Sequence, residues 1–473
     1  MSLILAGKHR RHHKRVWLPT GRNAECAPPC ELDFCGDLFL FRAMPHIGLI
    51  CPELSGHLNP LTTLGRELKR RGHRVTVVAR SDARRKAEEA GLEFAAIGTQ
   101  DFPEGAMRAE SAELGRLSGL KAIRFTAELL RRGAAVILRD APEIITRGEI
   151  DALVVDQVAQ AGGSVGDRLG LPHVTVCNAM AMNRDPDVPP GVLPWRFRPG
   201  ALGRLRNACG DALLRWLARP VVNEIDRYRE QHRLPRLCGG LTASSGLAQI
   251  AQQPAFFDFP RRALPGCFHY TGPWHDEGSG EKIAFPWEKL DGRPLIYASM
   301  GTLQNRLEFI FQTIAEACAG LDAQLVISLG SRDQDADALA GKFPGAPIVV
   351  AFAPQLALLE RAALSITHAG LNTALESLSH GLPMVAIPIT NDQPGVASRL
   401  EWLGVAEVVQ PRKLSASRLR AAVEKVLSEP RYREKAHRRQ EEIRRVNGVA
   451  LAADLAEEAF ATGRAVMRKI PKL

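Results

Sequence analysis

The stretch VAFAPQLALLERAALSITHAGLNTALESLSHGLPMVAIPITNDQPGVASR, residues 350–399, decides the fold of this chain. Two short apolar runs in it, 364–367 and 384–387, have the character of buried parallel strands. A helix-like segment lies between them, and strand, helix, strand is the repeating unit of a doubly wound α/β sheet. Such sheets bind ligands at the carboxyl ends of their strands, so the residues that follow each run form a candidate site.

The turn at 368–373 delivers polar side chains to the start of that helix. Free backbone N–H groups and the positive end of the helix dipole favour a phosphate there. Glu376, one turn into the helix, is placed to accept hydrogen bonds from a ribose diol. Asp392 and Gln393 follow the second run. The order of these groups predicts a site for a nucleotide, a diphosphate and a hydroxyl-rich group.

Taken singly, these residues have ordinary structural interpretations as a strand-end histidine, helix caps and a solvated turn. Their joint spacing resembles the signature of the UDP-sugar-dependent glycosyltransferases: aromatic-Ala-Pro-Gln, then Thr-His-x-Gly-x-Asn-Ser/Thr-x-x-Glu, then Asp/Glu-Gln. The chain matches it at 352–355, 367–376 and 392–393. It departs from the plant-type pattern at Phe352, where a tryptophan stacks on uracil, and at Ala369 and Leu371. Phenylalanine still offers a π face to the base.

The resemblance implies a UDP-sugar donor, UDP-glucose, with no cofactor and no metal. Phe352 would hold the base and Glu376 the ribose, while Asp392 and Gln393 would hold the sugar hydroxyls. The amide of Gln393 both donates and accepts hydrogen bonds, so we expect it to select the sugar. The expected donor-site residues are Ser299, Gly301, Thr302, Phe352, Ala353, Gln355, His368, Gly370, Asn372, Thr373, Glu376, Asp392 and Gln393.

A candidate catalytic pair comes from the first half of the chain. His57 lies in the loop after a buried run at 46–51, and Asp156 ends another buried run at 150–156. Taken alone, His57 has an ordinary interpretation as a surface histidine at the start of a helix. A carboxylate on its second nitrogen would fix its tautomer and stabilise the imidazolium, and the resemblance implies that the two residues form this dyad. The absence of Gly-x-Gly-x-x-Gly in this half disfavours a dinucleotide-dependent dehydrogenase.

Short apolar runs alternate with helical segments in both halves, which predicts an α/β fold. The expected architecture is two doubly wound Rossmann-like domains facing across a crevice, of the GT-B type that the resemblance implies. The expected divisions are a disordered N-terminal extension at 1–43, an acceptor-binding domain at 44–256, a linker at 257–293, a UDP-sugar-binding domain at 294–445, and a C-terminal helix at 446–473 that crosses back to the first domain.

Composition narrows the functional class. The net charge is +10, but the basic residues are dispersed without an aromatic-basic surface, so we expect no nucleic-acid partner. Nine mostly isolated cysteines favour a cytoplasmic location. No apolar run approaches the roughly 20 residues that cross a bilayer, which leaves peripheral contact with an anionic membrane open. Residues 333–337 contain the Asp-x-Asp pattern of metal-dependent transferases. We interpret this segment as a solvated loop and not as a metal site, because it lacks the apolar strand that usually presents such ligands.

Segments that lie outside the signature or extend it, such as 258–261 and 392–399, resemble the bacterial carotenoid glucosyltransferases within this family. This implies inverting transfer of glucose to the hydroxyl of a carotenoid such as zeaxanthin, giving a β-glucoside. Another lipophilic acceptor, such as a polyketide, macrolide or hydroxylated terpenoid, is the first alternative. A non-catalytic nucleotide-sugar-binding protein is the second, and it is disfavoured because a binder needs no base.

A helix-like segment at 196–219 has apolar residues on one side and arginines along its margins. One interpretation is an ordinary amphipathic helix packed on the first domain. The other is a helix that docks on an anionic bilayer, with arginines meeting lipid phosphates. The apolar residues are Leu202, Leu205, Cys209, Ala212, Leu213 and Trp216, and the arginines are Arg204, Arg206, Arg215 and Arg219.

Overall fold

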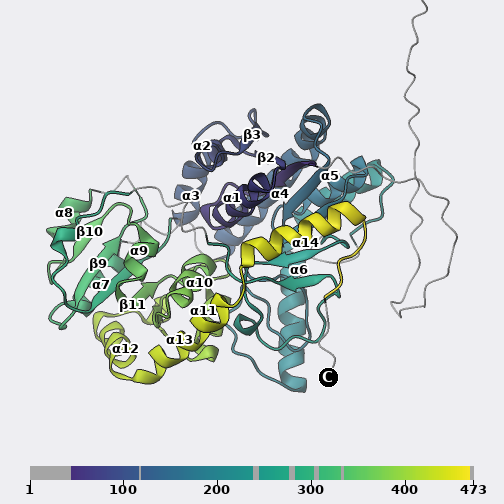
Figure 1. Cartoon of the computed structure of the whole chain (residues 1–473). Helices are drawn as coiled ribbons and strands as arrows, with labels where there is room; N and C mark the ends of the chain where they lie inside the picture. The colour runs from purple at the N-terminus through teal and green to yellow at the C-terminus, as the bar shows by residue number, and fades with distance from the viewer. Residues whose placement is uncertain are drawn as a thin grey trace, which may run out of the picture. The chain divides into compact units, whose positions relative to one another are not determined.

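The computed structural model describes residues 44–116, 119–237, 244–275, 283–302, 308–331 and 335–468. The expected extension at 1–43 lies outside these residues, as does 276–282 of the expected linker. The chain from Phe41 to Leu473 forms one compact unit. Two separate sheets lie within it, each flanked by helices (Figure 1).

The first sheet has seven strands, all parallel, in the order β3-β2-β1-β4-β5-β6-β7. Its central strands are apolar and buried on both faces, as parallel sheets require. The strand order reverses between β1 and β4, and ligands bind at such a reversal. The strands are β1 (His46–Ile50), β2 (Arg74–Ala79), β3 (Glu93–Ala96), β4 (Ala152–Asp156), β5 (His173–Cys177), β6 (Gln249–Ala251) and β7 (Phe268–Tyr270).

The second sheet has six parallel strands in the order β10-β9-β8-β11-β12-β13. Its order reverses between β8 and β11, which places a second binding edge there. The strands are β8 (Leu295–Ser299), β9 (Gln324–Ser328), β10 (Ile348–Val350), β11 (Ala362–Thr367), β12 (Met384–Ala386) and β13 (Ala406–Val408). The two sheets confirm the predicted α/β fold with two doubly wound halves.

Helices cover both faces of each sheet. In the first sheet, α1 and α14 pack on one face and α4, α5 and α6 on the other. In the second, α7 and α12 cover one face and α10, α11 and α13 the other. The first-half helices are α1 (Ser55–Arg70), α2 (Arg84–Glu89), α3 (Ala106–Arg116), α4 (Gly119–Arg147), α5 (Ala161–Leu169) and α6 (Ala201–Gln231). The others are α7 (Glu308–Cys318), α8 (Ala336–Ala340), α9 (Gln355–Leu359), α10 (Leu371–Ser379), α11 (Gln393–Leu403), α12 (Ala416–Ser428), α13 (Pro430–Arg444) and α14 (Gly448–Thr462).

None of the helices within the described residues combines the length and apolar character that a membrane span requires.

The boundary between the halves differs from the sequence prediction. Strand β7 belongs to the first sheet, although Phe268–Tyr270 falls inside the expected linker at 257–293. Three residues within a run rich in proline and aromatic residues give too short a pattern to reveal a strand. The first sheet therefore extends past the expected boundary.

The C-terminal helix α14 packs against α1 of the first half (Figure 1). Arg71, just after α1, donates hydrogen bonds to Asp454 at 2.6 Å and to Glu457 at 2.7 Å. A Cβ on Gly448, at the start of α14, would lie 2.7 Å from the carbonyl oxygens of Gly272 and Pro273. The two segments that pass between the halves therefore touch, and glycine allows this close approach.

Candidate active site

The carboxyl ends of β1 and β4 bring His57 and Asp156 together. His57 lies in the first turn of α1, which follows β1, and Asp156 is the last residue of the neighbouring strand β4. The His57 Nδ1 and Asp156 Oδ2 atoms are 2.8 Å apart. An ionised carboxylate only accepts hydrogen bonds, so Nδ1 carries the proton and Nε2 keeps its lone pair. That arrangement suits a general base.

Asp156 is fully buried, and its two oxygens accept hydrogen bonds from three donors. Besides His57, the Asn178 side-chain amide donates to Oδ2 at 2.7 Å and the Val158 backbone N–H donates to Oδ1 at 2.7 Å. Burial alone would lower the pKa of His57, but the charge and hydrogen bond of Asp156 outweigh it and raise that pKa above its usual value. The pair therefore stabilises the imidazolium that forms when His57 takes a proton.

Two glycine turns enclose the ring of His368. Gly301 follows β8 with a φ of 70°, a left-handed conformation that favours glycine, and Gly370 precedes α10. A Cβ on Gly301 or on Gly370 would lie 2.7 Å or 2.4 Å from His368 Nε2. Burial lowers the pKa of His368 to about 4, so its imidazole is neutral at pH 7. The second-sheet reversal thus presents a neutral imidazole between two close backbone turns.

The start of α10 lies directly beside the His57–Asp156 pair. Asn372 donates from Nδ2 to the carbonyl of Gly56, the residue before His57, at 3.1 Å. Its Oδ1 accepts a hydrogen bond from Gln252 Nε2 at 2.8 Å. Asn372, expected from the sequence to serve the donor phosphates, therefore uses its amide to join the two halves of the chain.

Glu376 ends a short chain of hydrogen bonds that starts in the sheet. The Tyr297 hydroxyl donates to Gln355 Oε1 at 3.0 Å, and Gln355 Nε2 donates to a Glu376 carboxylate oxygen. Burial raises the pKa of Glu376 to about 7, although the Gln355 hydrogen bond opposes that shift. The carboxyl group is therefore held in place and is about half ionised near neutral pH.

The two residues expected to hold the sugar differ in how their acceptor oxygens are used. Asp392 Oδ2 accepts a hydrogen bond from the backbone N–H of Met180 in the first half at 3.1 Å. Gln393 Oε1 accepts from the backbone N–H groups of Ile389 and Thr390, both at 2.9 Å. The carbonyl of Gln393 thus supports its own loop, and only its NH₂ group is left to contact a hydroxyl.

A cavity of about 1750 Å³ is lined by predicted site residues from both halves of the chain. Asp156 does not line the cavity itself, but it is hydrogen-bonded to His57, which does. The predicted residues that line the cavity are His57, Ser299, Gly301, Thr302, Phe352, Ala353, Gln355, His368, Gly370, Asn372, Thr373, Glu376, Asp392 and Gln393.

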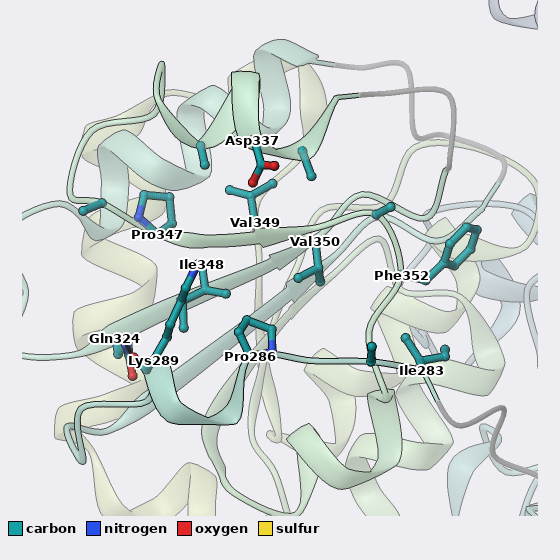
Figure 2. Close-up of a pocket in the computed structure, with 15 residues that line it drawn as sticks. Ile283, Pro286, Lys289, Gln324, Asp337, Pro347, Ile348, Val349, Val350 and Phe352 are labelled. Atoms are coloured by element: carbon teal, nitrogen blue, oxygen red, sulfur yellow. Dashed lines mark hydrogen bonds between the residues drawn. The ribbon is translucent and has the colours of Figure 1, made fainter.

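A second cavity, of about 890 Å³, lies along β10 at the edge of the second sheet, with Phe352 at one end (Figure 2). Phe352 therefore lines both cavities. Asp337 also lines this edge cavity, while Asp335 accepts a hydrogen bond from the Ala338 N–H at 3.0 Å as the cap of α8. Of the Asp-x-Asp pattern, Asp333 lies outside the described residues.

A buried ion cluster that sequence reasoning did not single out joins the two halves. Arg399 of α11 donates from Nη2 to Asp258 Oδ1 at 2.7 Å, and Arg261 donates from Nε to Asp258 Oδ2 at 2.6 Å. All three side chains are at most 3% exposed. Burial alone would raise the pKa of Asp258, but the two guanidinium groups lower it to about 2. The only sequence signal was that these residues fall in segments resembling the family.

Comparison with known proteins agrees with this geometry. Residues 243–442 match the family model described as "UDP-glucoronosyl and UDP-glucosyl transferase". The chain is 31% identical to the zeaxanthin glucosyltransferase of Pantoea ananas, over 90% of this chain and 98% of that protein. It is 32% identical to the zeaxanthin glucosyltransferase of Pseudescherichia vulneris, over 89% and 100%.

Among solved structures, the glycotransferase of kitacinnamycin matches with a TM-score of 0.70 and 24% identity, over 88% of this chain and 98% of that one. That likeness supports the GT-B fold. The extent of the sequence matches to the two bacterial enzymes goes further, and the chain belongs to the UDP-glycosyltransferase family of enzymes.

Proposed function

We propose that this glycosyltransferase moves glucose from UDP-glucose to the hydroxyl of a carotenoid such as zeaxanthin, with inversion, giving a β-glucoside. One observation carries the proposal: the His57–Asp156 pair and the donor groups meet at one cavity. The names of the two bacterial relatives support the acceptor.

The first-half side of the cavity suits a lipophilic acceptor. A hydroxylated carotenoid is a long apolar molecule with a hydroxyl on its terminal ring, so its site needs an apolar channel that ends at a base. Apolar side chains from several first-half elements line the same cavity as His57. They include Leu130, Val158, Met182, Val188, Leu214 and Leu217.

In the proposed step, His57 Nε2 takes the proton of the acceptor hydroxyl as its oxygen forms a bond to the anomeric carbon of glucose. The bond from that carbon to the diphosphate breaks, and UDP leaves with the electron pair. Attack from the face opposite UDP converts the α-linked donor into a β-glucoside. Asp156 stabilises the imidazolium and keeps the ring oriented.

The leaving diphosphate would lie at the second-sheet reversal. The backbone N–H groups at the start of α10 and the turn at Gly301 offer donors there. Because these groups belong to the protein itself, the proposed step needs no resident metal. Phe352 would stack on the uracil and Glu376 would accept from the ribose diol.

The acceptor is tested by competition among lipophilic alcohols. We expect the purified protein, given UDP-glucose and zeaxanthin in detergent micelles, to form a glucoside whose anomeric proton coupling is that of the β form. Its kcat/KM should exceed that for a macrolide, a polyketide phenol or a non-carotenoid terpenoid alcohol. Faster transfer to one of those would move the acceptor to the alternative class. If the protein bound UDP-glucose but transferred glucose to none of these acceptors, the proposed transfer reaction would be contradicted.

Donor binding should depend on pH through Glu376. Ribose hydroxyls donate to the ionised carboxylate, so binding favours that form, while burial holds the pKa of the free group at about 7. As pH falls below that value, binding must first remove a proton, and UDP affinity should fall by about tenfold per pH unit.

Calorimetric titration with UDP at several pH values measures this dependence without turnover. The Glu376→Gln variant should bind UDP more weakly at pH 8 and lose most of the slope, leaving only contributions from other groups such as His57. An unchanged slope in that variant would show that another residue holds the ribose.

A further inference from the structure

Helix α6 carries large apolar side chains on a solvent-exposed side. Leu202, Leu205, Leu213 and Trp216 are 67%, 64%, 51% and 57% exposed. With about 3.6 residues per turn, these four share one side of the helix with Cys209 and Ala212, which are also exposed. We refer to Leu202, Leu205, Cys209, Ala212, Leu213 and Trp216 as the α6 apolar face.

The opposite side of α6 is buried and consists of small and polar residues. Gly203, Asn207, Gly210 and Asp211 are the buried residues in this part of the helix. A Cβ on Gly203 would lie 1.8 Å from the Arg198 carbonyl oxygen, and one on Gly210 would lie 2.7 Å from the Trp195 ring. The preceding loop therefore packs against the glycines, which reverses the usual amphipathic arrangement. The interpretation of this helix as packed through its apolar face is wrong.

Arginines surround the α6 apolar face. Arg198, Arg206, Arg215 and Arg219 form no ion pair with a carboxylate of the described residues. The nearby carboxylates already have cationic partners: Asp187 pairs with Arg204 at 2.7 Å, and the buried Asp211 pairs with Arg184 at 3.0 Å. The surface around the apolar face is therefore positively charged.

The same helix forms part of the catalytic cavity. Leu213 belongs both to the α6 apolar face and to the cavity lining, and Leu214, Leu217 and Val221 continue that lining along the helix. Leu213 therefore connects the exposed α6 apolar face with the lining of the cavity that also holds His57.

We propose that the α6 apolar face docks on an anionic lipid bilayer, with its apolar side chains entering the acyl boundary and its arginines meeting lipid phosphates. A second copy of the chain fits this surface poorly, because a two-fold contact would bring the same arginine-rimmed patches together. The docking itself depends only on the exposure of the α6 apolar face and the charge of the arginines around it. The purpose of docking, which is to load an acceptor from the membrane, rests on the proposed function.

Vesicle flotation with the full chain tests the docking. Wild type should float with phosphatidylglycerol-containing vesicles, much less with pure phosphatidylcholine, and less as salt is raised. The Leu202→Glu/Leu205→Glu variant should lose flotation. Arg215→Gln/Arg219→Gln should bind about 25-fold more weakly, at about fivefold for each arginine.

Matched controls use exposed residues of the second half, Phe309→Glu/Leu427→Glu and Arg412→Gln/Arg418→Gln, which should float like wild type. All variants should keep wild-type affinity for UDP, which shows that they are folded. Equal flotation of wild type and both α6 variants would overturn the proposal. So would a wild type that does not bind vesicles and, by light scattering, forms a dimer that Leu202→Glu/Leu205→Glu dissociates. None of these measurements requires turnover, so they stand apart from the test of the acceptor.

Discussion

Replacing His57 with alanine should lower turnover by about 10²-fold to 10⁴-fold, the usual contribution of a positioned general base. The affinity for UDP should stay near that of wild type, because the proposed donor-binding residues belong to the second half of the chain. Initial rates at saturating donor, together with calorimetric titration of UDP, separate the two effects. Turnover near that of wild type in this variant would contradict the mechanism.

Asp156→Asn provides the matched comparison. It keeps the shape of the side chain but removes the charge that raises the pKa of His57 against the effect of burial. Turnover should fall, and the rise of kcat/KM with pH should move to lower pH because the imidazole is then easier to deprotonate. A merely structural role for Asp156 would reduce activity without moving that limb of the pH profile.

Asp258→Asn should lower the free energy of unfolding by about 3–5 kcal/mol, because it leaves two buried guanidinium groups without their carboxylate. Arg399 and Arg261 are 1% and 3% exposed, so water cannot replace the lost partner. Urea unfolding followed by circular dichroism measures the change. The effect should be largest above pH 4, where Asp258 of the wild type is ionised in both the folded and the unfolded chain.

Arg196→Gln is the control for that prediction. It breaks another ion pair between the two halves, in which Arg196 Nε lies 2.7 Å from Glu401 Oε2 but Arg196 is 78% exposed. Exposed pairs contribute about 0–1 kcal/mol, so this variant should unfold close to wild type. Similar losses in the two variants would show that burial of Asp258 does not set its importance.

The fold and the grouping of the site residues could be predicted because both follow from the order of strands, turns and helices along the chain. His57 and Asp156 each follow a buried run, and the carboxyl ends of parallel strands share one edge, so residues 99 positions apart meet. The spacing from His368 to Glu376 likewise places both on the same strand-turn-helix unit.

What sequence missed depends on distant contacts. The side-chain amide of Asn372 bonds to Gly56 and Gln252 in the other half of the chain, which no local pattern reveals. The partnership of Asp258 with Arg399 spans 141 positions. For α6, periodicity identified the residues that share a side, but it does not tell whether that side faces the core or the solvent.

The packing of α14 on the first half has a consequence for biosynthesis. Ala452, Ala456 and Phe460 of α14 complete the apolar core that also contains β1 and α1, and the Val466 N–H bonds to the Leu247 carbonyl at 2.8 Å. Domains usually fold as units while the chain emerges from the ribosome, N-terminal part first. Here the first half is made first, yet the part of its core that α14 covers stays exposed until residues 448–462 have been synthesised. A nascent chain interrupted before residue 448 would expose that apolar patch to chaperones and proteases.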